Sequence, residues 1–239
     1  MAGAALLQAA WLLSACDTRR EDDAPATNVA SAAPAQPSPS PSARVPVSGP
    51  RRVVLAFGDS LYAGYGLQRS QSLPDAIQAR LRGQGIDATV INAGVSGDTT
   101  ADGRRRLAYT LDRLKTKPDL VILGLGGNDV LRQVDPAETR ANMTAMLDEL
   151  ARRDIPVILT GMMAPPNLGP DFASRFNAIW PDLASSHHAV LDPFILQGVL
   201  GNRTLMLPDG VHPNATGVAR IADRVAPLVG KGLETLPKG

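Results

Sequence analysis

The sequence predicts an α/β fold, a single three-layer domain built on a doubly wound, mostly parallel sheet of five strands. Five short apolar runs recur along the chain from residue 52 onwards. Continuous apolar runs are typical of parallel strands that are buried on both faces. The segments between these runs carry apolar residues at helical spacing, and a regular alternation of strands and helices indicates a parallel sheet covered by helices.

The five expected strands are short and contain mainly β-branched and other apolar residues, as buried strands do. They are Val53–Phe57, Thr89–Ile91, Leu120–Leu123, Val157–Leu159 and Ala189–Leu191.

Four helices are expected from apolar residues that share one face of a helix. These residues are Leu73, Ile77 and Leu81; Leu107, Leu111 and Leu114; Met143, Met146, Leu147 and Leu150; and Val218, Ile221, Ala222 and Val225. Ser72 precedes the first helix and Asn214 the last, and both are good N-cap residues. Asp135 and Pro136 open the third helix with Glu138 at its third position, which predicts a capping box.

The N-terminal segment has the features of an export signal. Residues 4–15 are uncharged and mostly apolar, too short to span a bilayer but as long as the apolar region of a signal peptide. The sequence Leu13-Ser14-Ala15-Cys16 resembles a bacterial lipobox, in which the cysteine is lipidated, although no Lys or Arg precedes the apolar run. The resemblance implies an exported, periplasmic protein that is anchored to a membrane through Cys16.

The domain organisation follows from a change in composition. Residues 17–50 are rich in Pro, Ala and Ser, which predicts a disordered tether because such a segment buries too little apolar surface to fold. We therefore expect a signal segment at 1–16, the tether at 17–50, the folded domain at 51–232 and a tail at 233–239.

Composition also narrows the classes of function. The formal net charge is +1, which argues against a nucleic-acid partner. Aromatic residues make up only 4% of the chain, which argues against a surface on which bases or flat aromatic ligands stack. The single cysteine cannot form an internal disulfide.

Four loops at strand ends or helix starts carry polar residues that suit chemistry. They contain Gly58-Asp59-Ser60-Leu61, Asn92-Ala93-Gly94-Val95-Ser96-Gly97-Asp98, Gly126-Gly127-Asn128-Asp129 and Asp209-Gly210-Val211-His212. Because ligands of open parallel sheets bind outside the carboxyl ends of the strands, we expect these loops to converge on one site.

These residue types are the ones that acyl transfer requires: a nucleophile, a base, an acid that orients the base, and donors for the oxyanion. Ser60 is the expected nucleophile and His212 its base, and Asp209 lies three residues before that histidine. The other two histidines, His187 and His188, are adjacent and are expected at a solvated helix end.

Competing motifs fit poorly. The lipase motif G-x-S-x-G is absent, because Tyr62 stands where the second glycine would follow Ser60. The glycine-rich run that ends at Asp129 lacks the last glycine or alanine of a dinucleotide-binding motif. A metal site of Asp209, His212 and the histidine pair lacks the helical H-x-x-x-H spacing, so no metal is expected.

Together the four loops resemble the SGNH hydrolase family, whose name lists Ser, Gly, Asn and His. The resemblance covers residues 52 to 230 and places the family residues on Ser60, Gly94, Asn128 and His212, with Asp209 as the paired acid. It implies a flavodoxin-like fold and an oxyanion hole formed by Ser60, Gly94 and Asn128. The segments GDSLYAGYGL, NAGVSGDTT, GGNDVLR and DGVHPN are most similar to the arylesterase, thioesterase I and lysophospholipase branch.

The resemblance implies hydrolysis of carboxylic esters, and of thioesters or lysophospholipids, through an acyl-enzyme and without a cofactor. A carbohydrate O-acetylesterase is an alternative, and a non-catalytic lipid-binding lipoprotein is one of a different class. The segment from Met162 to Phe172 contains three prolines, which predicts a shaped loop. Leu168 and Phe172 are the residues expected to contact an acyl chain, unless the segment is an ordinary surface crossover.

Overall fold

The computed structural model describes residues 46–237, which contain a five-stranded sheet. The strands are β1 (Ser48–Gly58), β2 (Ile86–Gly94), β3 (Leu120–Gly124), β4 (Val157–Thr160) and β5 (Val190–Asp192). They lie in the order β2-β1-β3-β4-β5 and every pairing is parallel. This is the flavodoxin-like strand order, so the predicted fold class is confirmed.

Within the described residues, eight α-helices and two 3₁₀ turns lie between and after the strands. The helices are α1 (Ser60–Ala63), α2 (Leu73–Gly83), α3 (Thr100–Asp112), α4 (Gly127–Leu131), α5 (Pro136–Arg152), α6 (Pro170–Asn177), α7 (Ile179–Ser186) and α8 (Ala215–Glu234). The 3₁₀ turns are η1 (Arg69–Gln71) and η2 (Pro166–Leu168).

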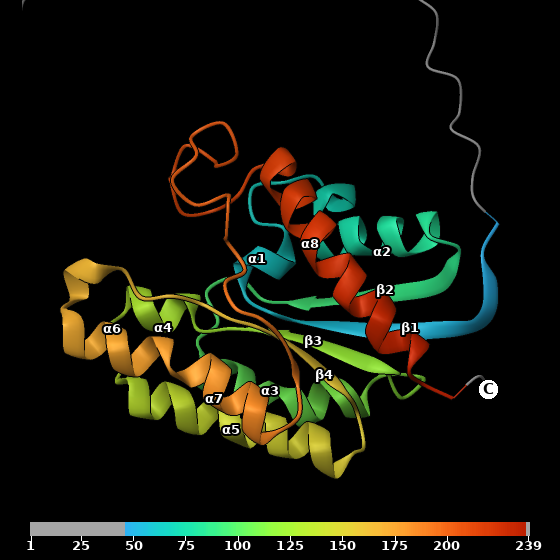
Figure 1. Ribbon diagram of the computed structural model, residues 1–239, viewed down its shortest axis with the longest axis horizontal. Helices are drawn as coiled ribbons and strands as arrows, with labels where there is room; N and C mark the ends of the chain where they lie inside the picture. The colour runs from blue at the N-terminus through green and yellow to red at the C-terminus, as the bar shows by residue number, and fades with distance from the viewer. Residues whose placement is uncertain (1–45, 238–239) are drawn as a thin grey trace, which may run out of the picture. The chain divides into compact units, whose positions relative to one another are not determined.

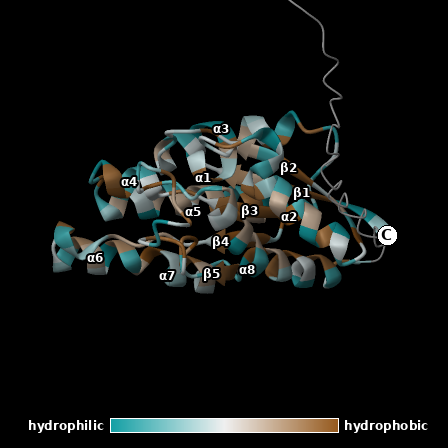
Figure 2. Cartoon of the chain, turned by 90° about the horizontal axis from the view of Figure 1, so that it is seen from above, coloured by the Kyte–Doolittle hydropathy of each residue, from teal (hydrophilic) through white to brown (hydrophobic). Residues whose placement is uncertain are grey.

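The helices form two layers, one on each face of the sheet (Figure 1). Helices α2 and α8 pack together on one face, and α3 and α5 pack together on the other, where α6 and α7 also contact α5. In Figure 2 the apolar colour gathers along the strands, which lie between the helices. The result is the three-layer arrangement that buried parallel strands require.

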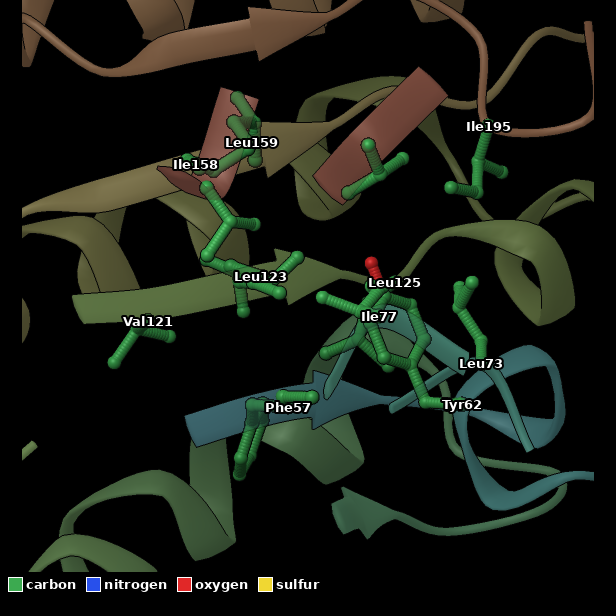
Figure 3. Close-up of a cluster of buried hydrophobic side chains, with 14 of the residues drawn as sticks. Phe57, Tyr62, Leu73, Ile77, Val121, Leu123, Leu125, Ile158, Leu159 and Ile195 are labelled. Carbon is green, nitrogen blue, oxygen red and sulfur yellow. The ribbon is translucent and has the colours of Figure 1, made fainter. Parts of the chain in front are cut away.

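The core lies on both faces of β1 and β3, whose apolar side chains are buried over residues 54–57 and 120–123 (Figure 3). Phe57, Leu123 and Ile158 have no exposed surface, and Tyr62 is 1% exposed. The Tyr62 hydroxyl is hydrogen-bonded to Thr160 Oγ1 at 2.7 Å, so its polar atom is satisfied inside the core.

The helix caps agree with the sequence at most positions. Ser72 and Asn214 are the N-caps of α2 and α8, as predicted. Asp135 caps α5 through the N–H of Ala137, whereas the predicted capping box with Glu138 is not among the hydrogen bonds of the described residues. Helix α3 ends at Asp112, so Leu114 packs against the core from the loop that follows rather than from the helix.

The folded region is longer than 51–232. Strand β1 begins at Ser48, whose N–H donates to the Gly85 carbonyl at 2.8 Å, and α8 continues to Glu234. Arg52 Nη2 then donates to the carbonyl of Pro237 at 2.8 Å. Cys16, proposed above as a lipidation site, and most of the expected tether lie outside the described residues. Within residues 46–237, no helix combines the length and apolarity needed to cross a membrane.

Candidate active site

The site lies where the strand order reverses, at the carboxyl ends of β1 and β3. These strands pair up to Gly58 and Gly124, and the chain then enters α1 at Ser60 and α4 at Gly127. Asp59 caps α1, its Oδ1 accepting the N–H of Leu61 at 3.0 Å. Ser60 is therefore the first residue of a short helix, a position that leaves its backbone N–H without an intrahelical partner.

Ser60, His212 and Asp209 form a continuous chain of hydrogen bonds. Ser60 Oγ lies 2.9 Å from His212 Nε2, and His212 Nδ1 lies 2.7 Å from Asp209 Oδ2. The backbone N–H groups of Val211 and His212 donate to Asp209 Oδ1 at 2.9 and 3.0 Å. One turn thus fixes the carboxylate and the imidazole relative to each other. Ser60 and His212 are 152 residues apart in the sequence, and the fold brings them together.

The loop that carries His212 is attached to the start of α8. Asn214 Oδ1 accepts the N–H groups of Thr216 and Gly217, both at 3.0 Å. Its Nδ2 donates to the carbonyls of Thr204 and Met206, which lie in the segment before the turn. The ring of Tyr65 lies 4.4 Å from that of His212, centroid to centroid, and covers one side of the imidazole.

Two carboxyl groups near the nucleophile have shifted pKa values of opposite sign. Hydrogen bonds from the backbone and the ring of His212 lower the pKa of Asp209 from 3.8 to about 2. This group therefore stays ionised and favours a proton on Nδ1 of His212. Burial raises the pKa of Asp59, which is only 2% exposed, from 3.8 to about 6.

The Asn128 amide faces the site and is held by a neighbouring loop. Its Nδ2 donates to the carbonyl of Asp98 at 2.9 Å, which leaves the second N–H of the amide for a ligand. Asn128 also lines the cavity beside Ser60. The structure thus brings together Ser60, His212, Asp209 and Asn128, as expected from the sequence.

Gly94, the glycine expected in the oxyanion hole, is placed differently. Its N–H donates to Asn92 Oδ1 at 2.9 Å, so this donor is already occupied. A Cβ at position 94 would lie 2.2 Å from the backbone nitrogen of Ala63, which explains the glycine by close packing against α1. The expected role therefore does not fit the hydrogen bonds of Gly94.

Gly97, three residues later, has the free donor that Gly94 lacks. Among the hydrogen bonds of the described residues, none uses the Gly97 N–H. Its φ of 88° lies in the left-handed region, which favours glycine, and the adjacent Asp98 is the residue whose carbonyl binds Asn128. Sequence reasoning missed Gly97 because the same motif contains both glycines, and neither the bond from the Gly94 N–H to Asn92 Oδ1 nor the positive φ of Gly97 can be seen in the sequence.

Arg106 is a second residue that the sequence did not single out. Its Nε donates to Asp98 Oδ2 at 2.6 Å and its Nη2 to the carbonyl of Gly58 at 2.9 Å. The guanidinium also lies over the ring of Phe57, 3.8 Å from the centroid. It therefore joins the loop that carries Gly97 to the end of β1, next to Ser60.

An apolar cavity of about 500 Å³ opens beside Ser60 and His212. Its apolar wall includes Leu61, Leu131, Met163, Phe194, Leu196 and Leu200. Three of these side chains are also exposed to solvent: Leu131, Met163 and Leu200 are 61%, 48% and 51% exposed. The cavity is therefore open to solvent at large apolar side chains.

Leu168 and Phe172 are not among the residues that line this cavity. Leu168 lies in η2, and Phe172 lies in α6, where its ring stacks on Phe176 at 5.9 Å. The segment is not one irregular loop, because Pro170 occupies the first turn of a helix and directs the later residues onto the core. Its first half does reach the cavity, through Met162, Met163, Pro165 and Pro166.

The other histidines lie elsewhere. His187 ends α7, and its Nε2 is 3.0 Å from Asp148 Oδ1 of α5, on the opposite face of the sheet from α8. His188 follows it with a φ of 54°. Neither takes part in the hydrogen bonds around Ser60.

Comparisons with known proteins agree with this geometry. Residues 56–220 match the model of the GDSL-like lipase/acylhydrolase family. The chain is 38% identical to esterase TesA of Pseudomonas aeruginosa, a match that covers 74% of this chain and 88% of that protein. It is 37% identical to an arylesterase of Vibrio mimicus, covering 72% and 86% of the two chains.

A third relative is thioesterase 1/protease 1/lysophospholipase L1 of Escherichia coli K12, which is 33% identical over 72% of this chain and 81% of that protein. Among solved structures, the SGNH-hydrolase family esterase AlinE4 superposes with a TM-score of 0.66 at 49% identity. That match covers 78% of this chain and 98% of AlinE4.

Proposed function

Because the chain belongs to the GDSL-like lipase/acylhydrolase family and is a serine esterase, we propose that Ser60, His212 and Asp209 are its catalytic triad. The observation that carries the proposal is the continuous chain of hydrogen bonds from Ser60 Oγ through the imidazole to the Asp209 carboxylate. A serine hydroxyl becomes nucleophilic when a base accepts its proton and a third group holds that base in the correct tautomer.

In the acylation step, Ser60 Oγ attacks the carbonyl carbon while His212 Nε2 takes the hydroxyl proton. The N–H groups of Ser60 and Gly97 and the free N–H of Asn128 then bind the oxyanion. The same imidazole passes its proton to the leaving oxygen or sulfur as the bond to the acyl carbon breaks. Water repeats the sequence on the acyl-enzyme, which releases the acid and restores Ser60.

The proposed substrates are esters, thioesters or lysophospholipids with an apolar acyl chain. The relatives named as arylesterase and as thioesterase/lysophospholipase support this range. The apolar cavity beside Ser60 supports the acyl preference, because each methylene that it buries adds about 0.8 kcal/mol of binding. An O-acetylesterase for carbohydrates would leave most of that apolar wall without a contact.

The test uses p-nitrophenyl esters from acetyl to dodecanoyl, with the native enzyme and Ser60→Ala. We expect kcat/KM to rise with chain length and then level off, and Ser60→Ala to lose all but a residual rate that comes from binding and the oxyanion hole. A serine-directed phosphonate should inactivate the native enzyme with one equivalent bound. A Ser60→Ala variant that keeps more than a few per cent of the activity would contradict the triad.

We further propose that the protein is exported and carries a lipid on Cys16. The apolar run at residues 4–15 and the Leu13-Ser14-Ala15-Cys16 motif support this proposal. Labelled palmitate should appear on the native protein and be absent from Cys16→Ser. Equal labelling of the two would show that the lipid is attached elsewhere.

A further inference from the structure

One wall of the acyl cavity is formed by a segment that belongs to no strand or helix. Phe194, Leu196 and Leu200 line the cavity and lie in the turns that follow β5. The segment's backbone hydrogen bonds are those of turns, such as Gln197 N–H to the Phe194 carbonyl and Leu200 N–H to the Leu196 carbonyl, with one bond from Ile195 N–H to the Gly161 carbonyl. A segment held by turns gains stability from side chains that bind its carbonyls.

The backbone of this segment is held by the side chain of Arg224, which projects from α8. Arg224 Nη2 donates to the carbonyls of Phe194 and Ile195 at 3.1 and 2.7 Å, and Nη1 donates to that of Gln197 at 3.1 Å. Three carbonyls within residues 194–197 thus bind one guanidinium. The same four residues include Phe194 and Leu196, whose side chains line the cavity.

The guanidinium is itself fixed by a buried carboxylate. Nε and Nη2 of Arg224 contact the two oxygens of Asp192 at 2.9 and 3.0 Å, and Asp192 is 1% exposed. Asp192 is the last residue of β5, so the ion pair ties α8 to the edge of the sheet. The planar guanidinium reaches all five acceptors from its three nitrogens, with the two hydrogens of Nη2 shared among three of them, whereas a lysine ammonium supplies three donors from a single point.

Helix α8 therefore connects the two halves of the site. Its N-terminal end is capped by Asn214, two residues after His212, and its middle holds the cavity wall through Arg224. One helix therefore contacts both the loop that carries His212 and the segment that carries Phe194 and Leu196.

We propose that Arg224 is a positioning residue for acyl-chain selectivity: it fixes Phe194 and Leu196 against the acyl chain without touching the reacting atoms. The inference rests on the proposed esterase function. It assigns to Arg224 an effect that grows with the length of the acyl chain, because a longer chain contacts more of the apolar wall that it supports.

The test compares Arg224→Lys with the native enzyme on acetyl, butyryl and octanoyl esters. We expect kcat/KM on the acetyl ester to stay within about twofold. On the octanoyl ester it should fall roughly 15-fold, mainly through KM, since two buried methylenes are worth about fourfold each. The pH dependence of kcat should be unchanged, because Ser60 and His212 are not affected.

Arg80→Lys is the matched control. Arg80 of α2 also contacts α8, through Asp223 and the carbonyl of Ala219, but it contacts no part of the cavity wall. We expect this variant to keep the native chain-length profile. Phe194→Ala, which trims the wall directly, should reproduce the selective loss on octanoyl esters.

A loss that is equal on acetyl and octanoyl esters would overturn the proposal and make Arg224 a general stabiliser of the fold. If Arg224→Lys does not fold, Asp192→Asn gives the second test, since it removes the ion pair and leaves the arginine in place, and it should show a smaller loss of the same kind. Failure of the proposed function is distinct, because the native enzyme would then lack Ser60-dependent activity on every ester.

Discussion

Asn128 is the side chain whose contribution to the transition state is easiest to isolate. Its amide is held by the Asp98 carbonyl at 2.9 Å, so the second N–H is already oriented before a substrate binds. We expect Asn128→Ala to lower kcat by roughly 10²–10³ with little change in KM, because an oxyanion donor acts mainly on the transition state. Steady-state kinetics on one ester is sufficient, and a change confined to KM would assign Asn128 to substrate binding instead.

Asp59 should make the protein less stable as the pH rises from about 4 to 6. Burial raises its pKa from 3.8 to about 6, so the folded protein keeps a proton that the unfolded chain loses in this range. The free energy of unfolding therefore falls through this window, by about 3 kcal/mol in total, and the loss is complete above it. Asp209, whose pKa is lowered to about 2, acts only at lower pH.

Asp59→Asn is the variant that tests this prediction. An asparagine keeps an oxygen for the N–H of Leu61 but cannot ionise, so the loss of stability between pH 4 and 6 should disappear. Urea unfolding at four pH values from 4 to 7 measures the difference between the two proteins. If the free energy of unfolding changed with pH in the same way in both proteins, the Asp59 carboxyl would not be the group responsible.

At the residue scale, the sequence predicted which polar groups the structure brings together, but not all of their partners. Ser60, Asp209 and His212 could be singled out because they lie in loops at strand ends or helix starts, and because the chain has only three histidines. The sequence analysis placed Gly94 in the oxyanion hole, because the sequence does not show that the Gly94 N–H already donates to the side chain of Asn92. Leu168 and Phe172 were expected to contact an acyl chain because their segment leaves the same edge of the sheet as the loops of the site. An apolar residue in a proline-rich segment can equally well face the core, and both side chains pack there instead.

At the scale of elements, Asn214 joins the loop of the base to helix α8. Asn214→Ala removes an N-cap and the two bonds from Nδ2 to Thr204 and Met206. We expect a loss of about 2 kcal/mol in the free energy of unfolding, together with a lower kcat, because the turn that holds His212 loses its anchor. Urea unfolding and ester kinetics measure the two effects.

Two further variants separate the effect of the helix cap, made by Asn214 Oδ1, from that of the two hydrogen bonds donated by Asn214 Nδ2. Asn214→Asp keeps the capping oxygen and loses the donors, so it should recover most of the stability but less of kcat. Asp135→Ala removes the cap of α5, which lies away from the site, and should lower stability with kcat unchanged. A native kcat in Asn214→Ala would show that the turn is held by its other contacts.

The strands and the long helices could be predicted because burial imposes a repeating pattern on them. The short helices α1 and α4 could not, because four or five residues carry no period. Helix α1 depends on the N-cap from Asp59 and ends at Gly64 in the left-handed region, and helix α4 begins after Gly126, which is also left-handed. Helix α6 was missed because Pro170 was interpreted as a loop residue, whereas proline is also favoured in the first turn of a helix.

At the scale of the whole molecule, residues 46–237 contain every group proposed for catalysis. A variant that starts at residue 46 should therefore have the native kcat/KM. A variant that starts at Arg51 should be less stable, because it lacks the bond from Ser48 to Gly85 and the pairing of Ser48 with Ile86. Thermal unfolding and ester kinetics compare the two, and lost activity in the longer variant would place a required group before residue 46.

The hydrogen bond from Arg52 to Pro237 brings the two ends of the folded region together, at the end of β1 opposite Ser60. A linker of about ten residues could therefore join them, and new termini could be opened at Lys115–Lys117, three exposed residues between α3 and β3. Circular permutation is tolerated at sites of this kind. In the permuted chain His212 would precede Ser60, while the distance between Ser60 Oγ and His212 Nε2 would stay the same. The order of the two residues along the polypeptide can therefore change without altering the reaction.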